Sequence, residues 1–411
     1  MGKTIFEDRR ELAVAASCDV LVAGGGIAGI AAAMAAARGG KQVILLEREY
    51  GLGGMATLGL ITIYLPLDDG EGRQVVFGIG EELLKLSIRF GAEANLPTAW
   101  LEAGSREDRV RQRYLTQFNP HLFALSVEQL LTKLGVRILY GTLLAGVTRD
   151  QDRIRCAIVE NKSGRTAIAA DAFIDATGDA DLCHLAGAKT ALHEGGNGLA
   201  SWYYYHDGRD VSLKMFGLAD IAQGAEPKQG DAEKYKAVMV ESLDRNFRFS
   251  GVDGEELSDA VIAAHAKMFE DILAQKGKNP SCVPVTISSI PLVRMSRRIV
   301  GTRTLDESEV HVRMEDSIGM TGDWRKRGPA FEIPYGTLCT PDVKNLLAAG
   351  RDISVTDAMW DITRVIPGCA VTGEAAGTAA VLGSDFPALD VAKLQGQLRA
   401  QGARIHLDEA E

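Results

Sequence analysis

The sequence has little of what several classes of protein depend on. Its six cysteines are scattered and none forms a Cys-x-x-Cys pair, which excludes a disulfide-bonded scaffold and a cysteine zinc site of the usual spacing. His193 and Glu194 lack the second histidine of a zinc-binding helix, so we expect a loop there and no metal site. With 45 basic and 55 acidic residues the net charge is −10, which argues against nucleic acid or an anionic membrane surface as a partner.

Long hydrophobic runs are also scarce. The exception is residues 20–37, an unbroken series of apolar residues and glycine. Because Gly24, Gly25, Gly26 and Gly29 interrupt it, we expect a buried strand, turn and helix rather than a membrane span. Glu11 and Asp19 do not suit a signal peptide. We therefore expect a cytoplasmic protein, and 411 residues predict two lobes rather than one.

The most informative feature is a glycine motif between a predicted strand and a predicted helix. Gly24, Gly26 and Gly29 form Gly-x-Gly-x-x-Gly directly after residues 20–23 and before an alanine-rich stretch. In a dinucleotide site the first glycine allows a tight turn, the second lets the backbone approach a pyrophosphate, and the third lets the helix pack on the strand. Glu47 ends the next apolar run, about 20 residues later, where a ribose 2′-hydroxyl is expected to be bound.

The rest of the chain predicts alternating elements. We expect amphipathic helices over 79–90 and 123–134, polar helices over 231–248 and 255–276, and a small-residue helix over 368–381. Short strands are predicted over 136–140, 143–148, 153–160, 166–170, 172–175 and 345–350, and those between 136 and 170 are typical of a β-meander.

Taken together, several blocks resemble the FAD-dependent oxidoreductase family of the glutathione-reductase-like flavoprotein superfamily. They extend from residue 17 to about 383 and comprise 24–29 with Glu47, 53–60, 173–181, 294–301, 333–335, and 345–350 continuing into 364–377. The resemblance implies an α/β fold: a Rossmann-like FAD-binding domain, with a three-layer parallel sheet plus a β-meander, and an inserted α+β substrate or cap domain. The implied boundaries are 17–61, 131–190 and 331–385 for the FAD domain, 62–130 and 191–330 for the cap, and 386–411 for a peripheral C-terminal helix or tail.

The resemblance also implies where FAD is held. The loop from Gly53 would run past the flavin, although a plain turn is the alternative there, and the helix from Pro367 would point its N-terminus at the flavin pyrimidine edge. The same helix also suits simple buried packing, and Cys369 is read as a packing residue. The implied FAD contacts are Gly24, Gly26, Ile27, Ala28, Gly29, Glu47, Arg48, Gly53, Gly54, Met55, Ala56, Thr57, Ala176, Thr177, Gly178, Gly350, Arg351, Asp352, Pro367, Gly368, Cys369 and Ala370.

Candidate substrate residues lie in the predicted cap and near the C-terminal block. If their segment is helical, Arg294 and Arg298 share one face and would clamp a carboxylate, with ordinary ion pairs as the alternative. His206 is a candidate acid or base, or a structural histidine. Asp179 and Asp181 are read as a helix cap and a solvated side chain rather than metal ligands. The remaining candidates are Tyr203, Tyr204, Tyr205, Arg297, Tyr335 and Trp360.

A single nucleotide fingerprint and the absence of a Cys-x₄-Cys pair mean that electrons enter or leave through the substrate or a separate donor or acceptor: oxygen, a quinone or a protein. The predicted reaction is hydride transfer between a small organic substrate and flavin N5, with no residue identified for covalent attachment of FAD. The alternatives are an electron-transfer subunit of a larger complex, a flavin-dependent modification enzyme and an NAD site. Assembly into a homo-oligomer is compatible with the sequence.

Overall fold

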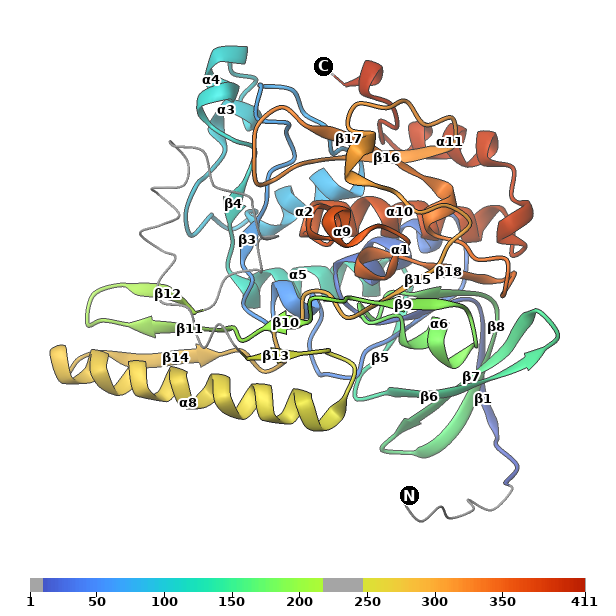
Figure 1. Ribbon diagram of the computed structural model, residues 1–411, viewed down its shortest axis with the longest axis horizontal. Coiled ribbons are helices and arrows are strands. Elements are labelled where there is room, and N and C mark those ends of the chain that lie inside the picture. The colour runs from blue at the N-terminus through green and yellow to red at the C-terminus, as the bar shows by residue number, and fades with distance from the viewer. Residues whose placement is uncertain (1–9, 217–246, 411) are drawn as a thin grey trace.

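The computed structural model describes residues 10–216 and 247–410. Its centre is a seven-stranded sheet in the order β5-β2-β1-β8-β7-β6, with β18 also paired to β8 (Figure 1). Strands β1 (Val14–Ala23), β2 (Val43–Leu46), β5 (Arg137–Leu139), β8 (Gly164–Asp175) and β18 (Leu346–Ala348) are parallel, whereas β6 (Leu143–Asp150) and β7 (Arg153–Asn161) are antiparallel additions. The predicted α/β class, a Rossmann-like sheet with a meander, is confirmed.

Alternate residues of the parallel strands face two separate cores. Val20 and Val22 pack with helices α1 (Ile27–Arg38) and α10 (Ile366–Leu382), whereas Leu21 and Ala23 pack with the β-meander and α6 (Asp181–Leu185). The molecule around the sheet is thus three layers: helices, sheet, and meander with α6. The parallel strands are buried on both faces, which explains their nearly continuous apolar sequences.

The predicted meander differs from the observed one at both ends. Residues 136–140, expected in the meander, contain β5, which instead pairs with β2 at the opposite edge of the sheet. The predicted strands 166–170 and 172–175 are one strand, β8, which joins the meander to the parallel sheet because it pairs with both β7 and β1.

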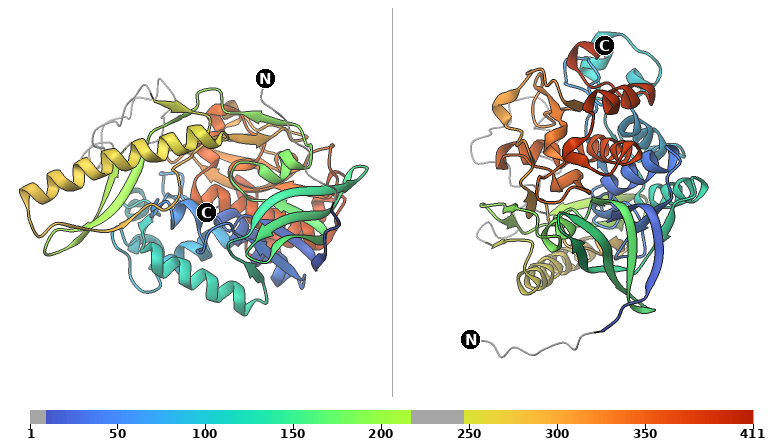
Figure 2. Two further views of the ribbon diagram at one scale, coloured as in Figure 1. Left: turned by 90° about the horizontal axis from the view of Figure 1, so that it is seen from below. Right: turned by 90° about the vertical axis from the view of Figure 1, so that its right-hand side faces the viewer.

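An elongated arm projects from this body (Figure 2). It contains β11 (Ser201–His206), β12 (Val211–Phe216), β14 (Val283–Ile287) and the long helix α8 (Gly254–Lys278). The predicted helix 255–276 is α8. Of the predicted helix 231–248, residues 231–246 lie outside the described residues, and Arg248 belongs to strand β13 (Arg248–Phe249).

The remaining elements lie outside the central sheet. The predicted helices 79–90 and 123–134 are α2 (Ile79–Ser87) and α5 (Pro120–Lys133). The others are β3 (Ile63–Tyr64), α3 (Thr98–Leu101), α4 (Arg106–Arg111), β4 (Thr116–Gln117), β9 (Thr190–Leu192), β10 (Asn197–Gly198), β15 (Arg297–Ile299), β16 (Ser317–Gly322), β17 (Ala330–Pro334), α9 (Asp357–Thr363) and α11 (Val391–Ala400). Among the described residues no single helix is long and apolar enough to cross a membrane, and α9 with α10 passes that test only as a pair bent by 89°.

Helices α1 and α10 approach each other backbone to backbone. A Cβ added to Gly373 would lie 2.2 Å from the carbonyl oxygen of Ala28, and one added to Gly377 would lie 2.2 Å from that of Ala32. Glycine at these two positions therefore brings the N-terminal ends of both helices to the same edge of the sheet.

Glu374 is a buried carboxyl group on α10 that also fixes α2. One oxygen accepts the amide of Ile79 at 2.9 Å, and the other has no hydrogen-bond partner within the described part of the chain. Burial raises the pKa of Glu374 from 4.5 to about 7. Because the carboxyl ionises more readily in the unfolded chain, the free energy of unfolding falls as the pH rises from 4.5 to 7.

We therefore expect Glu374→Gln to remove this pH dependence. At pH 8 the ionised side chain costs wild type about 3 kcal/mol relative to pH 4.5, and the variant does not bear this cost. Urea unfolding of both proteins from pH 4.5 to pH 8 tests this, with the exposed Glu102→Gln as control. Parallel stability curves for wild type and Glu374→Gln would contradict it.

Candidate functional site

The three motif glycines meet different surroundings. A Cβ at Gly24, whose φ is +103°, would lie 2.3 Å from the carbonyl oxygen of Ala176, and one at Gly29 would lie 1.9 Å from that of Gly24. At Gly26 an added Cβ would meet nothing within 4 Å. Gly24 and Gly29 thus permit close packing, whereas Gly26 faces open space. The first bond of α1 runs from Ile30 to Gly26, so the preceding amides of 27–29 are available to an anion.

A second glycine loop lies against this corner. The amide of Gly53 donates to the carbonyl of Gly25 at 2.8 Å, and Gly53 pairs with Gly26 in a parallel bridge. Gly54 also lies against the corner, because a Cβ added to it would be 3.2 Å from the Cα of Gly26. The hydroxyl of Thr57 stabilises the loop by donating to the carbonyl of Leu52 at 2.5 Å. This loop, which contains the buried Ala56, therefore forms the second wall of the space that Gly26 faces.

Glu47 secures the corner from the neighbouring strand. Its buried carboxylate accepts the amides of Gly25 and Glu49, each at 2.8 Å, and burial raises its pKa. A carboxylate oxygen has two lone pairs, so a sugar hydroxyl can still be bound there. Arg48 follows it and is half-exposed beside Glu49.

The ends of β8 and β18 bring a buried acid next to the same corner. Asp175 accepts both the amide and the hydroxyl of Thr177, which shapes the turn from Ala176 to Gly178. The amide of Gly178 donates to Oδ2 of Asp352 at 3.2 Å, whereas Oδ1 is buried and has no partner within the described ranges. Burial, with Asp175 and Asp179 nearby, raises the pKa of Asp352 well above its usual range.

Gly350 is the point at which the two helix starts meet. An added Cβ there would lie 2.8 Å from the Cβ of Ala28 and 3.6 Å from the sulfur of Cys369, and its amide donates to Thr372 of α10 at 2.9 Å. Helix α10 has no side-chain cap, and Pro367 and Gly368 form its first turn, followed by the buried Ala370. The N-termini of α1 and α10 thus converge, as the sequence predicts.

Cys369 is a buried thiol rather than an activated one. Its sulfur donates to the carbonyl of Arg364 at 3.2 Å, and burial raises its pKa to about 12. This placement agrees with the packing role expected for it.

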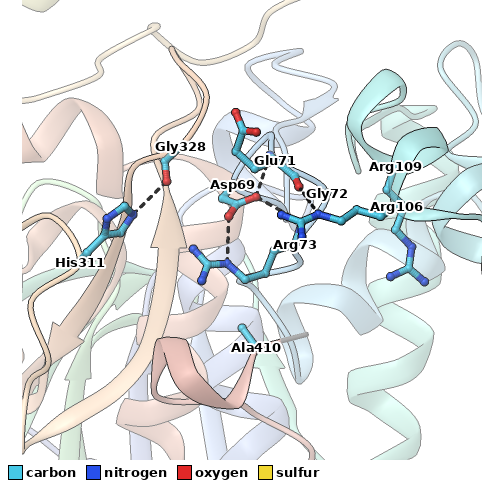
Figure 3. A pocket seen from close by; sticks show the side chains of 9 residues that line it. All are labelled: Asp69, Glu71, Gly72, Arg73, Arg106, Arg109, His311, Gly328 and Ala410. Carbon is cyan, nitrogen blue, oxygen red and sulfur yellow. Dashed lines mark hydrogen bonds and ion pairs between the residues drawn. The ribbon is translucent and has the colours of Figure 1, made fainter.

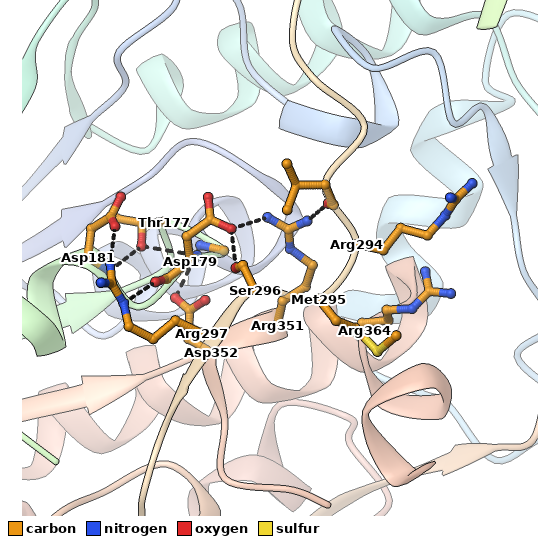
Figure 4. A network of polar contacts seen from close by, with 12 residues as sticks. Thr177, Asp179, Asp181, Arg294, Met295, Ser296, Arg297, Arg351, Asp352 and Arg364 are labelled. Atoms are coloured by element: carbon orange, nitrogen blue, oxygen red, sulfur yellow. Dashed lines mark hydrogen bonds and ion pairs between the residues drawn. The ribbon is translucent and has the colours of Figure 1, made fainter. Parts of the chain in front are cut away.

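Residues 293–298 cross the turn after β8 as an extended segment (Figure 4). Ser296 donates to the carboxylate of Asp179 at 2.5 Å, and Arg297 pairs with Asp181 at 2.5 Å. Arg351 reaches the same Asp179 at 3.4 Å. The expected helix cap is therefore wrong, because Ala180 occupies the N-cap of α6. The side chain of Asp181 is partly exposed, as expected, but each carboxylate also pairs with an arginine. Burial and Asp179 raise the pKa of Asp181 to about 6.

The predicted helical clamp of Arg294 and Arg298 is also wrong. The segment ends in strand β15, which pairs with β9, so these side chains do not share a helix face. Arg298 instead pairs with Asp357 at 3.2 Å and lies over the ring of Trp360. The side chain of Arg294 is buried.

Most of the other candidate substrate residues have structural partners. His206 accepts the amide of Gly208 at 3.0 Å in the turn between β11 and β12, at the outer end of the arm and away from α1 and α10 (Figure 1). Tyr203 donates to Asp271, Tyr335 to the carbonyl of Phe386 and Trp360 to that of Arg351. Tyr205 packs on Tyr203.

Tyr204 also has structural partners, and its ring packs next to the glycine loop. Its hydroxyl meets Thr62 at 2.9 Å and Glu93 at 2.8 Å. Its ring belongs to a buried apolar cluster bordered by Met55, which we call the cap cluster: Leu60, Ala200, Trp202, Tyr204, Met215 and Leu292. The indole N–H of Trp202 in this cluster has no partner among the described residues.

Asn197 is a site residue that sequence reasoning missed. Its buried side chain donates to the carbonyl of Met295 at 2.6 Å and accepts the amides of Arg294 and Met295. It therefore fixes the crossing segment. No local signal marks it, because its partners lie 97 and 98 residues further along the chain.

The arrangement fits FAD on two observations. Gly26 opens onto space beside the free amides at the N-terminus of α1, which suits a pyrophosphate, and the unpartnered oxygen of the buried Asp352 suits a hydroxyl of a polyol chain. Within the described ranges no group of three or more histidine, cysteine or acidic residues could hold a metal ion.

A family model matches nearly the whole chain. The model of the family described as FAD dependent oxidoreductase matches residues 19–398. No curated protein matches the chain in sequence. Among solved structures, a geranylgeranyl bacteriochlorophyll reductase-like protein from Thermoplasma acidophilum is 14% identical, with 95% of this chain and 85% of that one covered and a TM-score of 0.46. A p-nitrophenol 4-monooxygenase from Pseudomonas putida is 12% identical, with 94% and 81% covered and a TM-score of 0.42.

The family match covers more than nine-tenths of the chain and includes both glycine loops, the turn after β8 and the start of α10. The protein therefore belongs to the FAD dependent oxidoreductase family and is a flavin-dependent enzyme whose cofactor is FAD.

Proposed function

We propose that the protein transfers a hydride between a small organic substrate and N5 of FAD, and that it has the glutathione-reductase-like arrangement of two lobes. The observation that carries the proposal is the convergence of the N-termini of α1 and α10 at Gly350, with Asp352 between them. An extended dinucleotide needs such a site, because its pyrophosphate and its flavin lie at opposite ends of a polyol chain. We propose that the segments that hold FAD form one domain (17–61, 131–190, 331–385) and that the remaining segments form a cap (62–130, 191–330).

The residues proposed to hold FAD lie on these converging segments. The amides of 27–29, with Gly53 and Gly54 opposite, would bind the pyrophosphate, and Glu47 a ribose hydroxyl. Burial raises the pKa of Asp352 and so favours its protonated form, in which Oδ1 would donate to a ribityl oxygen. Bound FAD would supply the hydride acceptor or donor. The N-terminus of α10 would favour negative charge at the pyrimidine edge.

The cap cluster is proposed to shape the substrate side. Trp202, Tyr204 and Leu292 form an apolar wall next to Met55 of the glycine loop, and the amide of Ser289 ties the arm to Leu58 at 2.9 Å. A wall of this kind excludes water and selects a substrate with an apolar body. The unpartnered N–H of Trp202 would bind an acceptor on that substrate.

Anaerobic titration of the purified holoprotein tests the proposal. We expect visible flavin absorbance that is bleached by one class in a panel of hydroxy acids, amines, enoates and sugars, or, for the reduced protein, restored by it. Trp202→Phe keeps the apolar ring but removes the N–H, so it should raise KM for that substrate about tenfold with a smaller change in kcat. Tyr205→Phe, on the other face of the strand, serves as the control.

Two results would count against the proposal. Protein that takes up no FAD after reconstitution contradicts the cofactor site. A flavin that dithionite reduces but that responds to substrates only in the presence of a second protein favours an electron-transfer subunit instead.

A further inference from the structure

We propose that a second site, remote from the proposed FAD site, binds a small ligand bearing a phosphoryl group. It is a hollow of about 600 Å³ formed by the loop after β3, helix α4 and the region preceding β17, and we call it the basic hollow (Figure 3). Its charged lining residues are Asp69, Glu71, Arg73, Arg106, Arg109 and His311. None of them belongs to the glycine loops, the turn after β8 or the start of α10. A hollow of this size suits a small metabolite.

The charge of the basic hollow is opposite to that of the protein. The chain carries a net charge of −10, yet three arginines face this space. Asp69 is buried and already forms an ion pair with Arg73, whose Nε lies 2.9 Å from its carboxylate. Neither Arg106 nor Arg109 forms an ion pair with any residue in the part of the chain that the structure describes, and Glu71 is the one other acid in the lining. With Arg73 paired to Asp69, the remaining lining has two arginines against the single carboxylate of Glu71, so a net positive charge is left.

The two unpaired arginines are held in place by other contacts. The guanidinium of Arg109 lies 5.2 Å from the ring of Trp100, which stacks on Tyr114, and its buried Nε has no hydrogen-bond partner among the described residues. Arg106 donates to the backbone carbonyl of Glu71 at 3.1 Å. Figure 3 shows the guanidinium groups of Arg73 and Arg109 on either side of the hollow, with that of Arg106 between them. Such planar donors match the oxygens of a phosphoryl group.

The loop that contributes Asp69 to the basic hollow is fixed by a buried ion pair of the preceding residue. Asp68 has no exposed surface and accepts Arg113 at 2.7 Å, together with the amides of Gly70 and Tyr114. Arg327 joins the loop to α4 by donating to the carbonyls of Gly70 and Val110. Because loop and helix are already joined, a ligand would lose little free energy in ordering them.

Calorimetric titration of the FAD-loaded protein with pyrophosphate tests this proposal, since FAD then occupies the other phosphate-binding site. We expect saturable binding that weakens with added chloride, about tenfold weaker in Arg106→Gln and weaker still in Arg106→Gln/Arg109→Gln. Arg111→Gln, on the same helix but outside the hollow and 79% exposed, should bind like wild type. Because Arg109 packs on Trp100, the single Arg106→Gln variant keeps the test valid if the double variant is unstable.

Three results would overturn the proposal. They are the absence of saturable binding by wild type, equal affinity in wild type and Arg106→Gln, and binding of succinate but not pyrophosphate, which would assign the hollow to dicarboxylates.

Discussion

Gly26→Val is expected to abolish FAD binding and to leave the apoprotein folded. The backbone of Gly26 has φ −71° and ψ −177°, which valine adopts readily, and an added Cβ meets no protein atom within 4 Å. The new side chain would project into the space assigned to the pyrophosphate, so we expect FAD affinity to fall by about 3 kcal/mol or more, a factor of at least a hundred. Absorbance of the purified protein and fluorescence titration of the apoprotein measure this loss.

The circular dichroism spectra of the wild-type and Gly26→Val apoproteins should coincide, and their thermal unfolding midpoints should agree within a few degrees. Gly396→Val is the matched control, because Gly396 on α11 also has no atom near its Cβ position and is remote from the corner. Retention of wild-type FAD affinity by Gly26→Val would show that the cofactor does not approach this backbone.

Gly373→Ala is expected to destabilise the fold itself. Alanine is the better helix former by about 1 kcal/mol, so propensity alone predicts a gain in stability. The added methyl group, however, would lie 2.2 Å from the carbonyl oxygen of Ala28 and 2.9 Å from the Cβ of Ala31. Since backbone must move, α1 and α10 would separate, and we expect a loss of about 3 kcal/mol in the free energy of unfolding.

Urea unfolding of apoprotein and holoprotein tests this second prediction. Gly383→Ala, at the C-terminal end of the same helix, is the control, because its Cβ would be 3.9 Å from the side chain of Leu389, an ordinary contact. We also expect weaker FAD binding by Gly373→Ala, because Gly350 lies between the two helix starts. A variant as stable as wild type would mean that the helices are not in direct contact.

Local sequence was sufficient to predict the glycine corner. The pattern around Gly24, Gly26 and Gly29 fixes a strand, a turn and a helix through contacts among near neighbours, and the structure has all three. The same holds for the carboxyl end of β18 and the start of α10. Each of these features depends on backbone conformation that glycine or proline imposes locally.

Features that depend on distant partners could not be predicted in this way. Arg294 and Arg298 have the spacing of one helix face, yet pairing of β15 with β9, more than 100 residues earlier, makes the segment extended. The local pattern favoured a helix cap at Asp179, but its serine and arginine partners lie 117 and 172 residues further along the chain. In both cases tertiary contacts override the local pattern.

The packing of α1 against α10 has a consequence for synthesis on the ribosome. Helix α1 is buried along nearly its whole length, yet the helix that covers it begins at Ile366, when most of the chain has already been made. A nascent chain therefore displays an apolar helix until residues 346–382, which include β18, Asp352 and α10, have been made. We expect the cofactor to bind only after that point, and a holdase chaperone would bind at residues 27–38.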